Sequence, residues 1–220
     1  MKRPAKPHGK RARGGRSKSS ERWLNRQRKD PFARQAADAG NVSRAYYKLA
    51  EIDRRFSLIH RDSWVLELGG APGGWTRYIE TRLGDGRLVV CDPKPVQAAP
   101  ETHVVQGAYG EPAVAVNIQE FLGPRRLNLV LSDMAPNITG VRATDQALAM
   151  ELAQLTLDAA GEWLEPGGAV VVKMFHGEGF EPFIGEMRKQ FSKVRVVKPK
   201  ASRPESREVY AVGQQFLANG

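Results

Sequence analysis

The sequence predicts a doubly wound α/β fold, in which a mostly parallel sheet is covered by helices on both faces. Short apolar segments alternate with longer amphipathic segments over most of the 220 residues, as expected for strands that alternate with helices. The short segments are rich in Val, Leu and Ile, which is typical of parallel strands that are buried on both sides. Glycine-rich turns separate several of these segments.

After a short helical segment over 21–40 that Pro31 interrupts, the next predicted element is a helix over residues 43–57, in which Ala45, Leu49, Ile52 and Phe56 recur at helical spacing. Strands and helices then alternate, and no long helix separates the last two strands. We expect that pair to form a hairpin that adds one antiparallel strand. The predicted strands are 64–69, 86–92, 102–107, 128–133, 168–175, 193–198 and 207–213, and the further helices are 73–83, 143–164 and 179–191.

The charge of the chain is concentrated at its N-terminus. Residues 1–40 contain 13 Lys and Arg against 3 Asp and Glu, whereas residues 41–220 contain 21 of each kind, so the net charge of +10 belongs to the first part. We predict a basic N-terminal extension over 1–40, largely disordered at 1–20, and one domain over 41–220. A basic arm suits contact with nucleic acid; a solvated tail without a partner and an Arg-rich transit peptide are the alternatives.

The composition argues against several classes of protein. The single cysteine, Cys91, leaves no internal disulfide, and the four histidines are scattered without metal-binding spacing. No apolar run approaches the roughly 20 residues of a membrane helix, and the N-terminus lacks the apolar stretch of a secretory signal. We expect a cytoplasmic protein with no membrane span and no bound metal.

The first predicted strand ends in a glycine-rich turn, ELGGAPGGW at 67–75, and a helix follows at once. Such a turn lets a ligand approach the backbone and leaves amide groups at the helix start free to bind it. Gly69, Ala71 and Gly74 occupy the three positions of a dinucleotide fingerprint, so its central glycine is missing. Asp92 ends the second strand, near the ~20-residue distance at which a carboxylate binds ribose hydroxyls. Together these features predict an adenosine-type cofactor, although each alone also fits a plain tight turn.

Four charged residues stand where an α/β fold would place a catalytic site. Asp133 ends the fourth strand, Lys173 lies within the apolar fifth strand, Glu208 begins the seventh, and Lys48 lies on the first helix. Because ligands of open α/β sheets bind beyond the carboxyl ends of the strands, we expect Asp133 and Lys173 to meet beside the glycine-rich turn. Each residue also has a structural explanation, such as a turn cap or a surface ion pair.

Five segments of the chain stand out as longer motifs: SRAYYKL, LELGGAPGGW, SDMAPN, VVKMFHGEGF and SREVY. Read as a set over residues 41–213, they resemble the FtsJ/RrmJ family of ribosomal RNA 2′-O-ribose methyltransferases. The resemblance implies a class I, Rossmann-like methyltransferase fold with seven strands, the last antiparallel, and S-adenosylmethionine as cofactor. By this resemblance the catalytic residues are Lys48, Asp133, Lys173 and Glu208, and the cofactor contacts are Gly73, Trp75, Asp92 and Asp133, to which the turn adds Gly69.

The resemblance also implies a reaction. Lys173 would act as the base that takes the proton of a ribose 2′-hydroxyl. The implied substrate is a uridine in the A-loop of 23S ribosomal RNA, within the large ribosomal subunit, and the implied protein is a monomer. Two alternatives are a 2′-O-methyltransferase of transfer RNA and a non-catalytic RNA-binding factor for ribosome assembly. A methyltransferase of base or protein nitrogen is disfavoured, because residues 134–137 are Met-Ala-Pro-Asn rather than an NPPY-like motif.

The chain departs from the family pattern after the third strand. The family commonly has a Gly-Asp pair there that reaches the adenine amino group, whereas this chain has Gly107-Ala108. We expect that contact to be missing. Tyr109, Glu111 or a backbone carbonyl could replace it.

Overall fold

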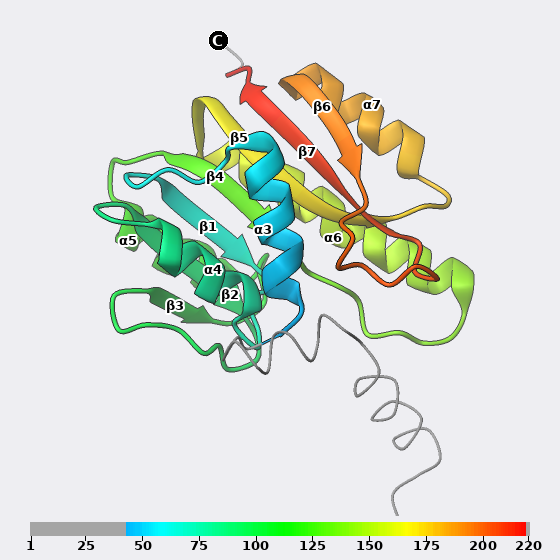
Figure 1. Cartoon of the computed structure of the whole chain (residues 1–220), viewed down its shortest axis with the longest axis horizontal. Coiled ribbons are helices and arrows are strands. Elements are labelled where there is room, and N and C mark those ends of the chain that lie inside the picture. Colours follow the sequence, from blue (N-terminus) through cyan, green and yellow to red (C-terminus); the bar gives the residue numbers. More distant parts are fainter. Residues whose placement is uncertain (1–42, 219–220) are drawn as a thin grey trace, which may run out of the picture.

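A seven-stranded mixed sheet organises residues 43–218, the part of the chain that the computed structural model describes (Figure 1). The strands lie in the order β3-β2-β1-β4-β5-β7-β6, and β7 runs antiparallel to both of its neighbours while the other pairs are parallel. The predicted fold, with its reversed last strand, is confirmed. The predicted extension over 1–40 lies outside the described residues. The strands are β1 (Trp64–Leu68), β2 (Arg87–Asp92), β3 (His103–Gln106), β4 (Leu127–Ser132), β5 (Leu164–Phe175), β6 (Phe191–Val197) and β7 (Glu208–Phe216).

Helices cover both faces of the sheet, because alternate residues of each inner strand are apolar on opposite sides. Val65 of β1 packs in the cluster with α3 and α4, whereas the next residue, Leu66, packs in the cluster with α5, α6 and α7. Both side chains are fully buried. The inner strands are therefore mostly apolar, as a sheet between two helical layers requires. The helices are α3 (Ala45–Phe56), α4 (Gly74–Arg82), α5 (Pro112–Leu122), α6 (Arg142–Trp163) and α7 (Phe180–Gln190).

Two elements differ from the sequence prediction. Helix α5 was not predicted, although Val114, Ile118 and Leu122 recur every four residues and are buried. Strand β5 begins at Leu164, earlier than the predicted start at 168, because the pairing with β4 continues across a register shift. Gly167 lies in this irregular stretch with φ +86°, a conformation that glycine adopts readily.

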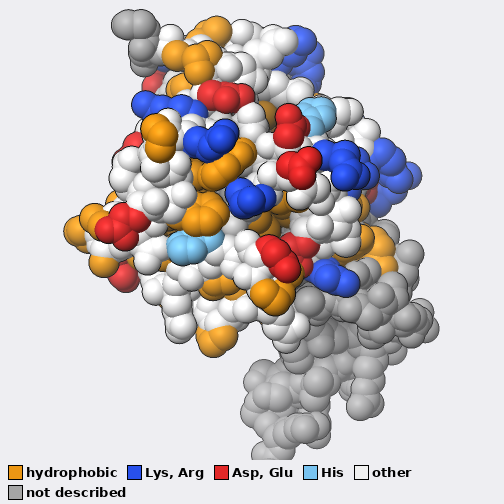
Figure 2. Space-filling model, turned by 90° about the vertical axis from the view of Figure 1, so that its left-hand side faces the viewer, with side chains coloured by type: hydrophobic (Ala, Val, Ile, Leu, Met, Phe, Trp, Pro, Cys, Tyr) orange, Lys and Arg blue, Asp and Glu red, His pale blue; other side chains and the backbone are white. Residues whose placement is uncertain are grey.

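The two edges of the sheet are less covered than its centre. Val104 on β3 and Val196 on β6 are each 40% exposed. Figure 2 shows that basic and acidic side chains are interspersed on the face it presents, with apolar side chains between them. Among the described residues, no helix is long and apolar enough to cross a membrane. Within the same residues, no three His, Cys, Asp or Glu side chains are grouped so that they could hold a metal ion.

The topology gathers several chain segments at the end of the sheet where its parallel strands terminate, which we call the carboxyl edge. Because β1, β4 and β5 are parallel, their carboxyl ends meet there. Strand β7 runs the other way, so it begins at that edge, and its first residue, Glu208, pairs with the last residue of β5, Phe175. The residues predicted for catalysis come from these ends and from α3.

Candidate active site

Lys173 and Asp133 form a direct ion pair at the carboxyl edge. The Lys173 Nζ lies 3.1 Å from the Asp133 Oδ1 and donates a second hydrogen bond, of 2.7 Å, to the Asp133 main-chain carbonyl. The lysine side chain is only 8% exposed. Two acceptors on one residue thus hold the amine in place, with little access for water.

Lys48 and Glu208 form a second ion pair beside the first. The Lys48 Nζ lies 2.6 Å from the Glu208 Oε1, and both side chains are buried. The Ser202 hydroxyl donates a 2.8 Å hydrogen bond to the same carboxylate oxygen. Lys48 of α3 therefore pairs with a carboxylate that is also held by Ser202, in the loop before β7.

Tyr210 connects the two ion pairs, and the sequence analysis did not identify it. Its hydroxyl donates a 2.7 Å hydrogen bond to the Asp133 Oδ1 and accepts one of 3.2 Å from the Lys48 Nζ. The side chain is fully buried. A signal was present, because Tyr210 lies two residues after Glu208 and residues at that spacing share one face of a strand.

The charges of this cluster reinforce each other. Burial acts to raise the pKa of Asp133, but the ammonium groups of Lys173 and Lys48 and the Tyr210 hydroxyl outweigh it, so the pKa is lowered. Burial and the carboxylates of Asp133 and Glu208 raise the pKa of Tyr210 well above its usual value. At neutral pH, Asp133 is thus a carboxylate and Tyr210 keeps its proton as a donor.

The glycine-rich turn lies against the loop that carries Asp133. Gly69 has φ +79°, and a Cβ there would lie 2.8 Å from the main-chain nitrogen of Met134. Gly73 has φ +118°, and a Cβ there would collide with the carbonyl oxygen of Gln97. Both glycines are therefore required by the protein's own backbone: Gly69 brings the turn into contact with the Asp133 loop, and Gly73 brings it into contact with the segment after β2.

Asp92 and Trp75 lie on either side of this turn. The Asp92 carboxylate accepts hydrogen bonds from the amides of Ala71, at 2.9 Å, and Lys94, at 2.8 Å. Each carboxylate oxygen keeps capacity for a further donor. The Trp75 ring is buried and packs at 5.6 Å, between centroids, from the Tyr210 ring. Trp75 thus joins the turn to the ion-pair cluster.

Two buried polar atoms beside the turn have no hydrogen-bond partner among the described residues, the Trp75 Nε1 and the Glu67 Oε1. The other Glu67 oxygen accepts a 2.7 Å hydrogen bond from the Thr76 hydroxyl. Burial raises the pKa of Glu67 to about 8. Both residues are almost completely closed to solvent, so these two atoms lie inside the protein, beneath the turn.

The region after β3, where the family acid is missing, contains another carboxylate. A Cβ on Gly107 would lie 3.3 Å from the Glu111 Oε2, and Glu111 and Asp92 both act on the Cys91 thiol, helping burial to raise its pKa to about 12. Glu111 is therefore close to Gly107 and near the end of β2. It is a candidate replacement for the acid that Ala108 lacks.

Comparisons with known proteins agree with this arrangement. The model of the FtsJ-like methyltransferase family matches residues 41–216. The chain belongs to this family. The ribosomal RNA large subunit methyltransferase E of Stutzerimonas stutzeri is 45% identical over 202 residues, which cover 91% of this chain and 98% of the relative. The enzyme of that name from Alkalilimnicola ehrlichii is 45% identical over 198 residues, 90% of this chain and 95% of the relative.

This FtsJ-like methyltransferase also resembles a solved structure. A Plasmodium falciparum protein, described as a putative ribosomal RNA methyltransferase, superposes with a TM-score of 0.71 at 26% identity, covering 80% of this chain and 99% of the other. The predicted family and the prediction of a methyltransferase are confirmed. The roles of individual residues stay predictions, although the methyltransferase brings Lys48, Asp133, Lys173 and Glu208 into one cluster. The adjoining turn contains Gly69 and Gly73, and Trp75 and Asp92 flank it.

Proposed function

We propose that this FtsJ-like methyltransferase transfers the methyl group of S-adenosylmethionine to a ribose 2′-hydroxyl of large-subunit ribosomal RNA, at a uridine in the A-loop of 23S rRNA. The observation that carries the proposal is the buried Lys173 amine held by the carboxylate and the carbonyl of Asp133. The ribosomal substrate is supported by relatives that carry the name ribosomal RNA large subunit methyltransferase E. Ribosomes are found in the cytoplasm, where we propose that the protein acts, as a monomer.

The glycine-rich turn and its neighbours would hold the cofactor. We assign the ribose hydroxyls to Asp92, and further cofactor contacts to the main chain of the turn at Gly69 and Gly73 and to Trp75. When bound, S-adenosylmethionine supplies a methyl group on a positively charged sulfur that leaves as a neutral thioether. The carboxylate of Asp133 adds a negative charge next to the turn, which favours a cation there.

Lys173 is our candidate for the base. A ribose hydroxyl is a weak nucleophile, so its proton has to leave as the oxygen–methyl bond forms. Lys173 must first release its own ammonium proton to solvent; the neutral amine can then accept the hydroxyl proton, and the ammonium that results is stabilised by the Asp133 carboxylate 3.1 Å away. Water has little access, which strengthens this interaction.

Lys48, Glu208 and Tyr210 position the reacting groups. The Tyr210 hydroxyl holds the Asp133 carboxylate at 2.7 Å, so the acid cannot turn away from Lys173. The positive charge of Lys48 lies within the same cluster, paired with Glu208. Much of the rate would come from this fixed geometry, since correct orientation of reactants removes a large part of a reaction barrier.

A transfer assay tests the proposal. The protein is incubated with methyl-labelled cofactor and, separately, with free ribosomal RNA, isolated large ribosomal subunits and transfer RNA, and the labelled ribose is mapped. We expect label on one ribosomal ribose, and none with Lys173→Ala. Label on transfer RNA would overturn the proposal that large-subunit ribosomal RNA is the substrate. Tight binding to subunits without label, under saturating cofactor, would instead identify an assembly factor.

A further inference from the structure

We propose that a recess between the loops after β4 and β5 receives the base of the methylated nucleotide, and that the Ile138 side chain holds this base out of its stack. The inference rests on the proposed function and adds the form in which the RNA is recognised. The recess has a volume of about 320 Å³. Its walls include Pro136, Ile138, Arg142, Phe175 and Arg207.

The recess adjoins the proposed catalytic amine. Phe175 lies two residues after Lys173 on β5, so both side chains are on one face of the sheet, about 7 Å apart along the strand. Glu208 pairs with Phe175 across the β5–β7 ladder. In a nucleotide, the base is attached to the carbon next to the one that carries the 2′-hydroxyl. A ribose at Lys173 therefore brings its own base within reach of the recess.

The first wall of the recess is held by Asp145, at the start of α6. Its Oδ1 accepts hydrogen bonds of 2.7 Å from both the amide and the hydroxyl of Thr139. Its Oδ2 accepts a 3.2 Å hydrogen bond from the Gly140 amide. One carboxylate thus fixes the loop that carries Ile138. A loop fixed before binding loses less entropy when the ligand arrives.

The second wall is held by the next residue, Gln146. Its Nε2 donates hydrogen bonds to the carbonyls of Phe175, at 3.2 Å, and Glu178, at 2.9 Å. Its Oε1 is buried and has no hydrogen-bond partner within the described residues. Because the two carbonyls need the amide hydrogens, the side chain cannot exchange its nitrogen and oxygen. Gln146 lines the recess, and its two donated hydrogen bonds fix the wall formed by Phe175 and the loop after it.

The third wall is tied to the second through Arg207 and His176. The His176 amide donates a 3.2 Å hydrogen bond to the Arg207 carbonyl, and the Arg207 guanidinium donates one of 2.9 Å to the His176 carbonyl. Three loops from distant parts of the chain therefore form one braced rim. Such a rim is typical of a preformed binding site.

The rim also exposes aliphatic side chains. Ile138 is 71% exposed and Val141 is 58% exposed, the highest values among the large apolar side chains described. Because Asp145 braces this loop, neither side chain can fold back into the core. Nucleic-acid-binding proteins use such aliphatic residues to separate stacked bases. Proteins that read RNA by sequence mostly take up bases that are already unstacked, in loops and single strands.

The charge around the recess fits a nucleotide. Arg142 and Arg207 are exposed on the rim and can contact phosphates. Of the two acids that line the recess, Asp145 is engaged by the loop, and Glu205 is exposed to solvent. Continuity with the candidate active site favours the target nucleotide over a separate ligand.

A crosslinking experiment tests the position of the base. Cys91 is the single cysteine of the chain and is buried, with its pKa raised to about 12 by burial, so a thiol-specific photo-crosslinker should label Ile138→Cys selectively. The matched control is Val116→Cys on α5, where Val116 is 56% exposed. Both proteins are bound to unmodified large ribosomal subunits and irradiated. We expect the Ile138→Cys protein to crosslink to the nucleotide that the parent methylates. No crosslink, or one only at another nucleotide, overturns the inference.

A kinetic comparison separates this inference from the proposed function. We expect Ile138→Ala to lower kcat/KM for subunits by about tenfold or more, as a lost contact with a base does. Cofactor affinity should be unchanged, and Val116→Ala should behave as the parent. If the parent does not methylate ribosomal RNA, the proposed function fails. If the parent methylates it but Ile138→Ala is as active, only the base recess is wrong.

Discussion

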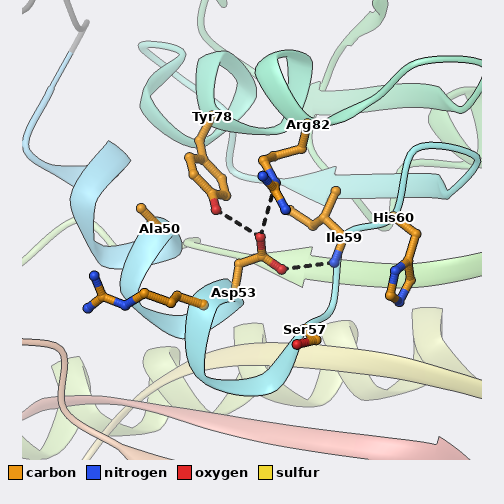
Figure 3. A pocket seen from close by; sticks show the side chains of 8 residues that line it. Ala50, Asp53, Ser57, Ile59, His60, Tyr78 and Arg82 are labelled. Carbon is orange, nitrogen blue, oxygen red and sulfur yellow. Dashed lines mark hydrogen bonds and ion pairs between the residues drawn. The ribbon is translucent and has the colours of Figure 1, made fainter.

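Two aspartates of the described residues use the same kinds of partner for different purposes: Asp53, which is buried, and Asp133, whose side chain is 19% exposed. Asp53, on α3, accepts a 2.8 Å hydrogen bond from the Tyr78 hydroxyl and lies 3.5 Å from the Arg82 Nε, just as Asp133 accepts one from Tyr210 and pairs with Lys173. Figure 3 shows the Asp53 carboxylate between Tyr78, Arg82 and the main chain of Ile59.

The difference lies in the remaining partners. The Asp53 Oδ1 accepts hydrogen bonds of 2.9 Å from the amides of Leu58 and Ile59, directly after α3. Its cation, Arg82, is 53% exposed, whereas Lys173 is 8% exposed. Asp53 thus fixes a local turn next to an open recess of about 530 Å³, while Asp133 organises buried amines from distant segments. The two aspartates therefore differ in whether their cation is sequestered and in whether the main chain needs the acid.

The largest expected effect distinguishes the two cations. Lys173→Ala should lower the rate of methyl transfer by about 10²–10⁴-fold, the usual contribution of an acid–base group, with cofactor affinity within a few fold of the parent. Arg82→Ala, the matched change at the other aspartate, should leave the rate nearly unchanged. Single-turnover assays and calorimetric titration of the cofactor measure both. Equal losses in the two variants would contradict the distinction.

The second prediction concerns the structural aspartate. Asp53→Ala leaves two main-chain amides and the Tyr78 hydroxyl without their buried acceptor, so we expect a loss of about 2–4 kcal/mol in the free energy of unfolding. The turnover of the fraction that remains folded should be close to that of the parent. Urea unfolding and active-site titration give the two values. A stable but inactive variant would show that Asp53 belongs to the catalytic machinery.

A further buried carboxylate, Glu67, sharpens the comparison. Burial raises its pKa from 4.5 to about 8, and the negative charges of Asp133 and Glu80 add to this rise. Between these two pH values the unfolded chain releases the proton while the folded chain keeps it, so this group makes stability fall as pH rises. Glu67→Gln should remove that fall, a difference of roughly 2–4 kcal/mol above pH 8. Unfolding curves from pH 5 to 9 measure it, and parallel curves for parent and variant would exclude the raised pKa.

The smallest effect compares the two tyrosines. Tyr78→Phe and Tyr210→Phe each remove one hydroxyl from a carboxylate, and each should cost about 1 kcal/mol of stability. Only Tyr210→Phe should also slow methyl transfer, by about tenfold, because Asp133 then loses the group that holds it towards Lys173. Thermal unfolding and single-turnover rates separate the two effects. If Tyr78→Phe also slows methyl transfer, the rate depends on the contact between α3 and α4, and not on the Tyr210 hydroxyl at Asp133.

The sequence by itself determined the sheet, the order of its strands along the chain and the edge at which the site lies. Val, Leu and Ile recur in the strands because burial on both faces favours apolar side chains at most positions. Lys173 and Asp133 could be paired in advance because parallel strands end at one edge. Helix α5 was missed, even though its buried residues Val114 and Ile118 recur at helical spacing.

Only the tertiary structure decided which polar groups meet. In the sequence, Tyr210 looks like one more aromatic residue of an apolar strand. Its hydrogen-bond partner Asp133 is 77 residues earlier in the chain. Asp145 and Gln146 read as ordinary first-turn residues of a helix, yet they brace two different loops. The sequence could not distinguish the roles of Asp53 and Asp133. These roles depend on whether the carboxylate oxygens accept hydrogen bonds from main-chain amides or from buried amines. Hydrogen bonds depend on direction and on distances of a few tenths of an ångström, and packing between segments that are remote in the chain sets both.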